Sequence, residues 1–434
     1  MVQLNRWLGY TAKASGLCAM VLIAACTAEK TVADTAGDNA KKELAKPLDP
    51  VTVNMYLQAA SYWTEEDFAK AIAEPVKKKY PHITVNRIVK DLPTALAAGE
   101  TADLYVSWTG PMVTVKDYDF FMDMTPLIKK HNFDLGRIDA SALEMARLIS
   151  DSGKELYALP YTTHASGLYY NKAIFDKFGV AYPPDGMTWD DAIALGVKLN
   201  RQDGGVQYYG LGTDSFSRIT FQKSLALVDP KTEKANVNSD PYRLTLETFK
   251  KIFASQGLTR SLGSNETFLK TQNVAMWANV NIWTALRTAN MNWDVAQYPS
   301  FPGQPNVYGM HDLHYVAMNK HSKHQDDAMR VIEMMFTDQL HEYLVTTVGR
   351  FSTMADPKFN LMFGKSHPEF QGKRLTSMMK SHPAPAAAFS RYYEKATSIL
   401  NGKMPAYLNN EVDINTMLRQ AEEEINQYIS TQKK

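Results

Sequence analysis

The stretch LYALPYTTHASGLYYNKAIFDKFGV, residues 156–180, places aromatic and hydroxyl side chains close together just ahead of a helix-like segment. A buried strand would contain fewer hydroxyl groups, and an exposed loop would contain fewer aromatic rings. The composition of residues 156–170 therefore suits neither environment alone. The side chains that make it unusual are Tyr157, Tyr161, Thr162, Thr163, His164, Tyr169 and Tyr170.

Upstream of this stretch, the residue pattern predicts strands that alternate with helices. Residues 51–58, 83–90 and 102–108 are rich in β-branched and aromatic residues, which is typical of strands. Thr64 precedes three acidic residues and predicts the N-cap of a helix between the first two strands. A strand, a helix and a strand in this order predict a parallel α/β lobe. The apolar face of the helix recurs every four residues, at Phe68, Ile72, Val76 and Tyr80.

The downstream half of the chain has the same alternation. Thr188 precedes a helical pattern at residues 189–200, and Asp191 stands where it completes a capping box. Apolar stripes predict further helices at residues 327–344 and about 411–430. We interpret their Met and Leu residues as core, so no cofactor is expected.

The N-terminus has the features of an export signal. Arg6 and Lys13 precede an apolar run at residues 14–25, which is shorter than the roughly 20 residues that a membrane-spanning helix requires. The run ends in IAAC, which resembles a bacterial lipobox and implies a signal peptide at residues 1–25 and acylation of Cys26. The alternative is an ordinary cleavage site with a chance cysteine. After cleavage Cys26 would be the only cysteine, so no structural disulfide is expected.

Residues 26–50 are expected to form a flexible tether, because they contain almost no large apolar side chains. We therefore expect an exported protein that a lipid anchor holds at the outer face of the bacterial cell membrane, or on the periplasmic side in a cell with two membranes. The whole chain has 47 basic and 46 acidic residues. This balance gives no electrostatic reason to expect a nucleic-acid partner.

Residues 153–200 resemble the family 1 extracellular solute-binding proteins of ABC importers, a group that includes maltose-binding proteins. The family pattern of a proline or small residue, a later small residue, hydrophobic residues and Tyr-Asn is matched here by Pro160, Gly167, Leu168, Tyr169, Tyr170 and Asn171. Tyr161 departs from the pattern, which prefers an aliphatic residue there. Blocks with further family features follow in order, so that the resemblance covers nearly all of residues 51–434. They are PPDGMTWDDAIALGVKLN at the end of this stretch, then TFLKTQNVAMWANVNIW, VAQYPSFPG, and the segment from YVAMNKHSK to GRFSTMADP.

This resemblance implies a two-lobe α/β fold of the type II periplasmic-binding-protein class, with a ligand cleft between the lobes. The first lobe would comprise residues 51–160 and 311–350, and the second lobe residues 161–310 and 351–434. Residues 156–180 would then cross the cleft floor, partly buried and partly facing ligand. The implied protein is a monomeric receptor without catalytic activity. It would bind a carbohydrate, an oligosaccharide in particular, and its protein partner would be the permease transmembrane subunits of an ABC importer.

Aromatic rings and fixed polar groups are the side chains that a sugar site requires, because sugars present C–H faces and hydroxyl rims. The resemblance places Trp108 and Trp283 at ligand-stacking positions, with Trp277 as a further candidate. Pro111 stands where a family member has an acidic residue, so the rim contacts there must differ. The polar and additional candidates for ligand contact are Gln58, Trp63, His164, Asp214, His311, Asp312 and Arg350. A looser resemblance near the C-terminus adds Phe389, Tyr392 and Tyr393.

Four histidines, at positions 311, 314, 321 and 324, raise the question of a metal site. Strand residues three apart point to opposite faces, so His311 and His314 are not expected to share an ion. We therefore expect no metal.

Two other functions stay open at the level of sequence. Tyr169 and Tyr170 could belong to a receptor for ferric ion or an organic anion, although neighbours in a strand face opposite ways. A secreted glycan hydrolase would need two carboxylates about 5–9.5 Å apart, for which only Asp214 and Asp312 are available at the implied cleft. The sugar, its length and its linkage are not determined by the sequence.

Overall fold

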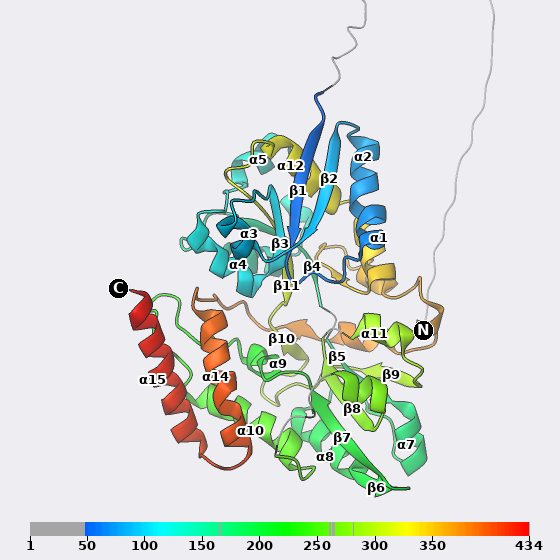
Figure 1. The fold of residues 1–434 in the computed structure, drawn as a ribbon. Coiled ribbons are helices and arrows are strands. Elements are labelled where there is room, and N and C mark those ends of the chain that lie inside the picture. The colour runs from blue at the N-terminus through cyan, green and yellow to red at the C-terminus, as the bar shows by residue number, and fades with distance from the viewer. Residues whose placement is uncertain (1–47, 165, 260–261, 263–264, 281, 434) are drawn as a thin grey trace, which may run out of the picture. The chain divides into compact units, whose positions relative to one another are not determined.

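The computed structural model describes residues 48–434 except for 165, 260, 261, 263, 264, 281 and 434 (Figure 1). The expected signal peptide, the expected acylation site at Cys26 and most of the expected tether lie outside the described residues. Residues 48–434 form one compact unit. Within this unit the strands belong to two main sheets, each with its own helices.

The sheet of the first lobe combines strands from three parts of the chain. β1 runs parallel to both of its neighbours, β2 and β3. In the β1–β2 pair, Val51 lies opposite Ile83. β11 lies antiparallel between β3 and β4, and β12 closes the other edge against β4. The strands expected near the N-terminus are therefore confirmed. The strand bounds, in sheet order, are β12 Phe351–Ser352, β4 Ala158–Thr163, β11 Leu313–Met318, β3 Leu104–Trp108, β1 Val51–Leu57 and β2 Ile83–Val89.

The helical segment between β1 and β2 begins at the predicted cap. Thr64 Oγ1 accepts a hydrogen bond of 3.0 Å from the backbone N–H of Asp67. The segment continues as α1 (Glu65–Phe68), a π-helical turn (Ala69–Ala73) and α2 (Glu74–Lys79). Its apolar face packs into the core through the buried residues Phe68, Ile72 and Val76.

One predicted helix is broken in the structure. The apolar stripe at residues 327–344 spans α12 (Gln325–Met335), α13 (Asp338–Tyr343) and part of a π-helical turn (Leu344–Val348). The break occurs because Thr337 caps α13, where its side chain accepts from the backbone N–H of Leu340. The stripe remains buried on both sides of the break. The other helices of this lobe are α3 Leu92–Ala97, α4 Thr109–Val115, α5 Thr125–Lys130 and α6 Ala140–Arg147.

The sheet of the second lobe has the order β6, β7, β8, β5, β9, with bounds of Arg201–Asp203, Val206–Thr213, Val274–Asn279, Gly167–Asn171 and Trp293–Ala296. β7 and β8 are parallel, whereas β5 is antiparallel to both β8 and β9. Every residue of β5 and β8 is buried. Residues 167–171 of the opening stretch therefore form a central strand of this lobe.

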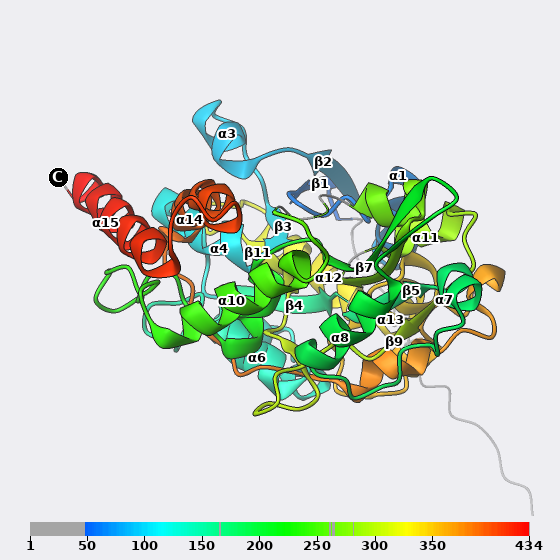
Figure 2. The same cartoon turned by 90° about the horizontal axis from the view of Figure 1, so that it is seen from below.

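Helices surround the second sheet, and the predicted capping box is present at the start of one of them. Thr188 accepts from the backbone of Asp191, whose side chain accepts in return from the backbone of Thr188. The C-terminal helix begins slightly later than expected, because Asp413 caps it. The helix bounds are α7 Lys172–Phe178, α8 Trp189–Leu199, α9 Ser217–Thr220, α10 Asp240–Ala254, α11 Trp283–Thr288, α14 Tyr393–Leu408 and α15 Ile414–Gln432. α14 and α15 lie side by side at one flank (Figures 1 and 2).

The chain passes between the two sheets at three places, which we call the first, second and third crossings. The first joins β4 to β5 and contains His164, and the second joins β10 (Val307–Gly309) to β11 through residues 310–312. The third comprises residues 349–353 around β12, after which the chain reaches β13 (His382–Pro383), the partner of β10. β4 extends to Thr163 and pairs there with Phe351 of β12, so the first and third crossings lie side by side.

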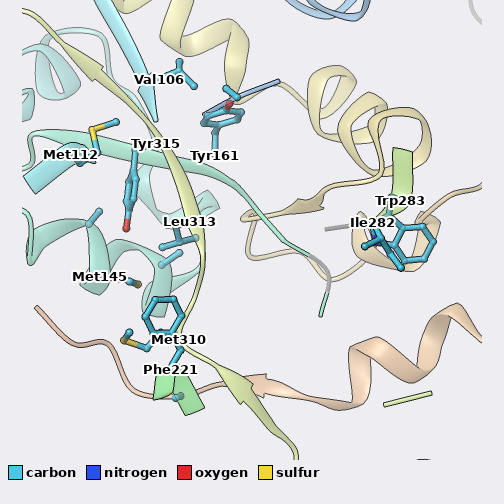
Figure 3. Packing of buried hydrophobic residues seen from close by; sticks show 14 of the residues in the cluster. Val106, Met112, Met145, Tyr161, Phe221, Ile282, Trp283, Met310, Leu313 and Tyr315 are labelled. Atoms are coloured by element: carbon cyan, nitrogen blue, oxygen red, sulfur yellow. The ribbon is translucent and has the colours of Figure 1, made fainter. Parts of the chain in front are cut away.

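Buried apolar side chains pack around the crossings. Met310 lies beside Phe221 of the second lobe, and its backbone N–H donates to the carbonyl of Phe221 over 3.1 Å (Figure 3). Leu313 and Tyr315 of β11 are fully buried in the same region (Figure 3). The cleft floor therefore rests on a continuous core.

Candidate functional site

A cavity of about 360 Å³, which we call the cleft pocket, has walls from both lobes and from the crossings. Parallel strands β1 and β3 end at the first-lobe wall, and β7 ends at the second-lobe wall. Ligands of open α/β sheets characteristically bind outside the carboxyl ends of the strands. The lining residues are Ala59, Ser61, Tyr62 and Trp108 of the first lobe; Ser215, Ser217, Arg218, Phe221, Tyr393, Glu394, Thr397 and Asn401 of the second lobe; and His164, Asp312 and His314 at or beside the crossings.

An ion-pair network joins the second-lobe wall to the second crossing. Arg218 Nη1 donates to Asp312 Oδ2 over 3.0 Å, and its Nε donates to Asp214 Oδ2 over 3.3 Å. Burial would lower the pKa of the Arg218 guanidinium, but the charges of Asp214 and Asp312 outweigh it and raise the pKa. The guanidinium therefore stays charged and holds both carboxylates in place.

A second contact joins the third crossing to the first. Arg350 Nη1 lies 2.7 Å from His164 Nδ1 and 3.1 Å from His164 Nε2. Burial, followed by the charges of Arg350 and Arg218, lowers the pKa of His164 well below its usual value. A neutral imidazole has an acceptor nitrogen, so it can accept a hydrogen bond from the guanidinium. His164 Nε2 also lies 3.5 Å from Asp312 Oδ2, which brings all three crossings into one polar cluster.

Tyr62 joins this cluster to the first lobe. Its ring lies under the guanidinium of Arg350, with 4.3 Å between the guanidinium carbon and the ring centroid. Its hydroxyl is 2.6 Å from the hydroxyl of Tyr161 and 3.0 Å from Nδ1 of His314. Cation–π contact and two polar contacts hold the Tyr62 side chain at the pocket wall. Contacts with Arg350, Tyr161 and His314 therefore fix the position of Tyr62.

Trp108 forms the aromatic wall of the first lobe and faces aromatic residues of the second. Its ring is edge-on to Phe389 and Tyr393, with centroid separations of 6.5 and 6.1 Å. Gly110 lies beside the Trp108 ring and has no space for a side chain. A Cβ atom at this position would be 2.5 Å from Glu394 Oε1 and 2.7 Å from the Trp108 ring. Burial raises the pKa of Glu394. The two lobes thus approach each other closely at Trp108 and Gly110.

The structure brings together several residues that the sequence predicted. Trp108, His164 and Asp312 line the cleft pocket. Asp214 is not a lining residue, but it accepts a hydrogen bond from the lining residue Arg218. Arg350 contacts His164 and Tyr62, which both line the pocket. The loosely matched Tyr393 is also a lining residue, and Phe389 contacts Trp108.

His311 belongs to a different cavity. It lines a space of about 390 Å³ behind the crossings, together with Asp139, Tyr308 and residues of the third crossing. Its Nε2 lies 2.9 Å from Ser141 Oγ. His311 is therefore not among the residues that line the cleft pocket, and its expected ligand contact stays a prediction. Its neighbour Asp312 faces the cleft pocket instead.

Three tryptophans that we expected at the ligand are buried in the core. Trp283 is 2% exposed among the rings of Tyr169, Trp293, Phe363 and Phe370. Figure 3 shows it beside Ile282 and well apart from Phe221 and Met310. Trp277 and Trp63 are fully buried, and their ring N–H groups donate to Asn265 Oδ1 and to the Tyr161 hydroxyl. None of the three lines the cleft pocket, because their rings are packed in the core and those of Trp63 and Trp277 are also hydrogen-bonded there; their expected ligand contacts stay predictions.

Gln58 is likewise committed to its own lobe. Its side chain donates to Asp91 Oδ1 over 3.0 Å and accepts from the Tyr105 hydroxyl over 2.6 Å. It does not line the cleft pocket. The sequence correctly indicated the end of β1, but the residues there that reach the pocket are Ala59, Ser61 and Tyr62.

Arg218, Glu394 and Tyr62 are site residues that sequence reasoning missed. Arg218 carried a signal, because it stands four residues after Asp214, where side chains on one helical turn can pair. Tyr62 precedes Trp63, and only packing decides which of the two faces the pocket. Glu394 follows Tyr393 at the start of α14 and had no motif to mark it.

Among the described residues, no group of three or more His, Cys, Asp or Glu side chains is arranged to hold a metal ion. Tyr169 and Tyr170 lie inside the second-lobe core, where both side chains are almost fully buried. In the part of the chain that the structure describes, no helix has the length and apolar character of a membrane span.

A two-lobe α/β fold with a polar and aromatic pocket between its lobes defines the class of bacterial solute receptors. The model of the bacterial extracellular solute-binding protein family matches residues 60–341, and the chain belongs to this family. The resemblance inferred from the sequence is thereby confirmed. A protein of Brucella abortus (strain 2308) named "Putative binding protein" is 26% identical over 292 residues, which cover 61% of this chain and 68% of that protein.

Solved structures share the fold at low sequence identity. The ABC substrate-binding protein of Listeria monocytogenes in complex with cycloalternan superposes with a TM-score of 0.71 at 18% identity, covering 88% of this chain and 100% of that one. The sugar-binding protein MalE from the phytopathogen Xanthomonas citri gives a TM-score of 0.68 at 15% identity, covering 88% of this chain and 98% of that one. The expected two-lobe fold is therefore confirmed.

Proposed function

We propose that this protein is the substrate-binding subunit of an ABC importer and that it binds a sugar or oligosaccharide in the cleft pocket. One observation carries the proposal: side chains of both lobes and of the crossings meet at a single pocket of about 360 Å³. This volume is within the roughly 300–1,000 Å³ typical of small-molecule sites. The sugar ligands and functions named for similar structures support the class of ligand.

The pocket has the two kinds of group that sugars require. Trp108 and Tyr393 offer aromatic rings to the C–H face of a sugar. Arg218 and Asp312 offer charged donors and acceptors to its hydroxyl rim, together with the hydroxyls of Ser215 and Ser217. Because Trp283 is buried, we propose Tyr393 as the aromatic group of the second lobe.

Lobe closure would be coupled to binding through these same walls. A ligand that contacts Trp108 on one lobe and Arg218 on the other gains those contacts together only in the closed form. Its differential affinity for that form shifts the equilibrium between open and closed states. The crossings at His164, Asp312 and Arg350 are the segments about which the lobes would move.

We further propose that Cys26 carries a lipid, that residues 26–50 tether the folded lobes to the outer face of the cell membrane, and that the closed monomer delivers its ligand to the permease. The export-like N-terminus and the match to an extracellular family support this arrangement. The lobes would comprise the expected residues, with crossings near 160, 310 and 350.

A hydrolase is not favoured by the carboxylates of the site. Asp214 and Asp312, the pair that sequence analysis left open, are both bound by Arg218. Because Arg218 engages both carboxylates in ion pairs, neither is free to act on a glycosidic bond as a hydrolase requires. We therefore propose binding without catalysis.

Calorimetric titration of the purified protein with a panel of mono- and oligosaccharides tests the proposal, with native mass spectrometry to detect solute that co-purifies. At least one sugar should bind, and Trp108→Ala should weaken its binding about tenfold or more through loss of stacking and apolar contact. Tyr182→Ala is the matched control, since Tyr182 is an exposed aromatic residue of the second lobe. Binding of an amino acid, peptide or metal ion, with no heat from any sugar, would contradict the proposal.

A further inference from the structure

A second cavity opens beside the cleft pocket and differs from it in chemistry. This apolar pocket, of about 540 Å³, lies in the second lobe between α10 and α14. Six residues line both cavities, namely Ser215, Ser217, Phe221, Tyr393, Thr397 and Asn401. The two spaces are therefore adjacent along a shared wall.

One face of α14 runs along both cavities. Tyr393 and Thr397 stand at the shared wall, whereas Leu400, Met404 and Leu408 continue into the apolar pocket at spacings of three and four residues. Residues with this spacing occupy one face of a helix. The character of this face thus changes along the helix, from polar and aromatic at the cleft to aliphatic beyond it.

The opposite wall of the apolar pocket is also hydrophobic. It includes Phe216, Leu227 and Phe249, and Phe249 stacks edge-on with Phe216 at a centroid distance of 5.5 Å. Charged groups are scarce there: Asp214 is the acidic residue of the lining, and it lies at the end nearest the cleft, four residues before Arg218. Threonine and asparagine side chains also line this pocket, but a sugar unit set against Phe216, Phe249 and Leu400 would find no hydrogen-bond partners on those side chains, which costs free energy.

Close packing is the rule inside proteins, so a large apolar cavity next to a ligand site calls for an occupant. We infer that the ligand is amphiphilic: its sugar part lies in the cleft pocket, and an attached alkyl, acyl or aryl group lies in the apolar pocket between α10 and α14. This inference rests on the proposed function, because it assigns the sugar to the cleft pocket. The adjacency of the two cavities, which share six lining residues, is the observation that selects this occupant.

Free sugars and their octyl glycosides, used below the concentration at which the glycosides form micelles, test the inference by calorimetry on the full-length mature protein. Wild-type protein should bind the octyl glycoside of an accepted sugar at least tenfold more tightly than the free sugar, because the added methylene groups are removed from water. Equal affinity for the two compounds would overturn the inference. That result would leave the proposed function intact, whereas binding of neither compound across the panel would count against both.

Substitutions on α14 locate the octyl group. Met404→Trp should fill the apolar pocket and reduce the octyl advantage to less than threefold, while the affinity for the free sugar stays unchanged. Pro405→Trp acts at the exposed rim of the same pocket, and it replaces a proline within the helix, so it should not disrupt folding. Ser398→Trp adds the same bulk to the exposed side of α14 and should keep the full octyl advantage.

A longer unmodified sugar is the competing occupant. If maltopentaose gained affinity over maltose, and Met404→Trp removed that gain while octyl maltoside showed none, the pocket would hold sugar units and the inference would be overturned. If the octyl advantage persisted unchanged in both Met404→Trp and Pro405→Trp, the octyl group would bind elsewhere, and the inference would again be overturned.

Discussion

Arg350 and His164, which are 186 positions apart in the sequence, lie 2.7 Å apart between Nη1 and Nδ1. Arg350 is 1% exposed and is the cation at the third crossing, whereas His164 belongs to the first. Asp312 of the second crossing completes the cluster, at 3.5 Å from His164 Nε2. The three segments about which the lobes would move are thus joined by side chains as well as by the backbone.

Replacement of Arg350 should change the protonation of His164. Burial lowers the pKa of His164 first, and the positive charge of Arg350 lowers it further. In Arg350→Met the pKa of His164 should therefore rise towards its usual value. An NMR titration of the histidine ring signals measures it, with Arg330→Met on α12 as the control. An unchanged His164 pKa would show that the two groups do not interact.

Loss of Arg218 should reduce both stability and ligand binding. Arg218→Met leaves the carboxylates of Asp214 and Asp312 without their shared cation. Removal of one partner from a buried ion pair costs about 3–5 kcal/mol, and we expect about 3 kcal/mol because the Arg218 side chain retains 19% exposure. Urea unfolding measures this loss, and ligand affinity should fall at least tenfold in calorimetry.

Arg419→Met is the matched control, since Arg419 pairs with Glu423 on the exposed face of α15. This substitution should cost less than about 0.5 kcal/mol. Equal losses in the two variants would mean that the Arg218 network adds nothing beyond a surface pair.

Gly110 should be required for the fit between the lobes. In Gly110→Ala the new methyl group would meet the Trp108 ring and the carboxylate of Glu394, so that Trp108 must move. We expect weaker sugar binding with a circular dichroism spectrum like that of the wild type. Gly402→Ala on α14 has no heavy atom within 4 Å of the added Cβ, and it should raise stability by about 0.5–1 kcal/mol without changing affinity. Wild-type affinity in Gly110→Ala would refute the close approach.

Acid should destabilise the protein partly through His311. Burial lowers the pKa of His311 to about 4, although Asp139 opposes this effect. As the pH falls below about 6.5, the His311 ring takes up a proton in the unfolded state and not in the folded state. The contribution of the neutral ring to stability is therefore complete above pH 6.5 and is lost as the pH falls from 6.5 to about 4. Between these two pH values the free energy of unfolding changes by about 1.4 kcal/mol per pH unit for one such group.

His311→Gln should remove that part of the slope in the free energy of unfolding, measured by urea at pH 7, 6 and 5. His321→Gln, which makes the same change at an exposed histidine, is the matched control. A wild-type slope in His311→Gln would show that the ring is protonated in the folded protein as readily as in the unfolded one.

Acylation is expected at Cys26. Metabolic labelling with palmitate in a bacterial host should mark the wild-type protein and leave Cys26→Ala unlabelled, and the variant should be released into the soluble exported fraction. Equal label in both proteins would mean that Cys26 is not the attachment site.

The fold was predictable because local signals agreed with one another. The alternation at residues 51–58, the cap at Thr64 and the capping box at Thr188 each specify an element without help from distant residues. The break at Thr337 was not apparent, because the apolar stripe continues through it and only the cap marks the new helix.

The site was predictable only where a residue's direction follows from its element. The family resemblance indicated that Trp108 faces the cleft, and Trp108 does stand at the end of β3 and line the cleft pocket. Trp283 likewise follows shortly after a strand, because β8 ends at Asn279. Its ring, however, packs against Phe363 and Phe370, about 80 residues later in the chain. No local pattern contains that information. The same holds for Tyr62 and Trp63, which are neighbours in sequence and differ in which one reaches the pocket.

A crystal structure of the protein with its co-purified or calorimetrically identified ligand tests the central claim most directly. Our account predicts a sugar ring in the cleft pocket, in contact with Trp108 and Tyr393, with its hydroxyl groups bonded to Arg218 or Asp312. A bound ligand that contacts only one lobe, or that lies away from Trp108 and Arg218 altogether, would contradict it.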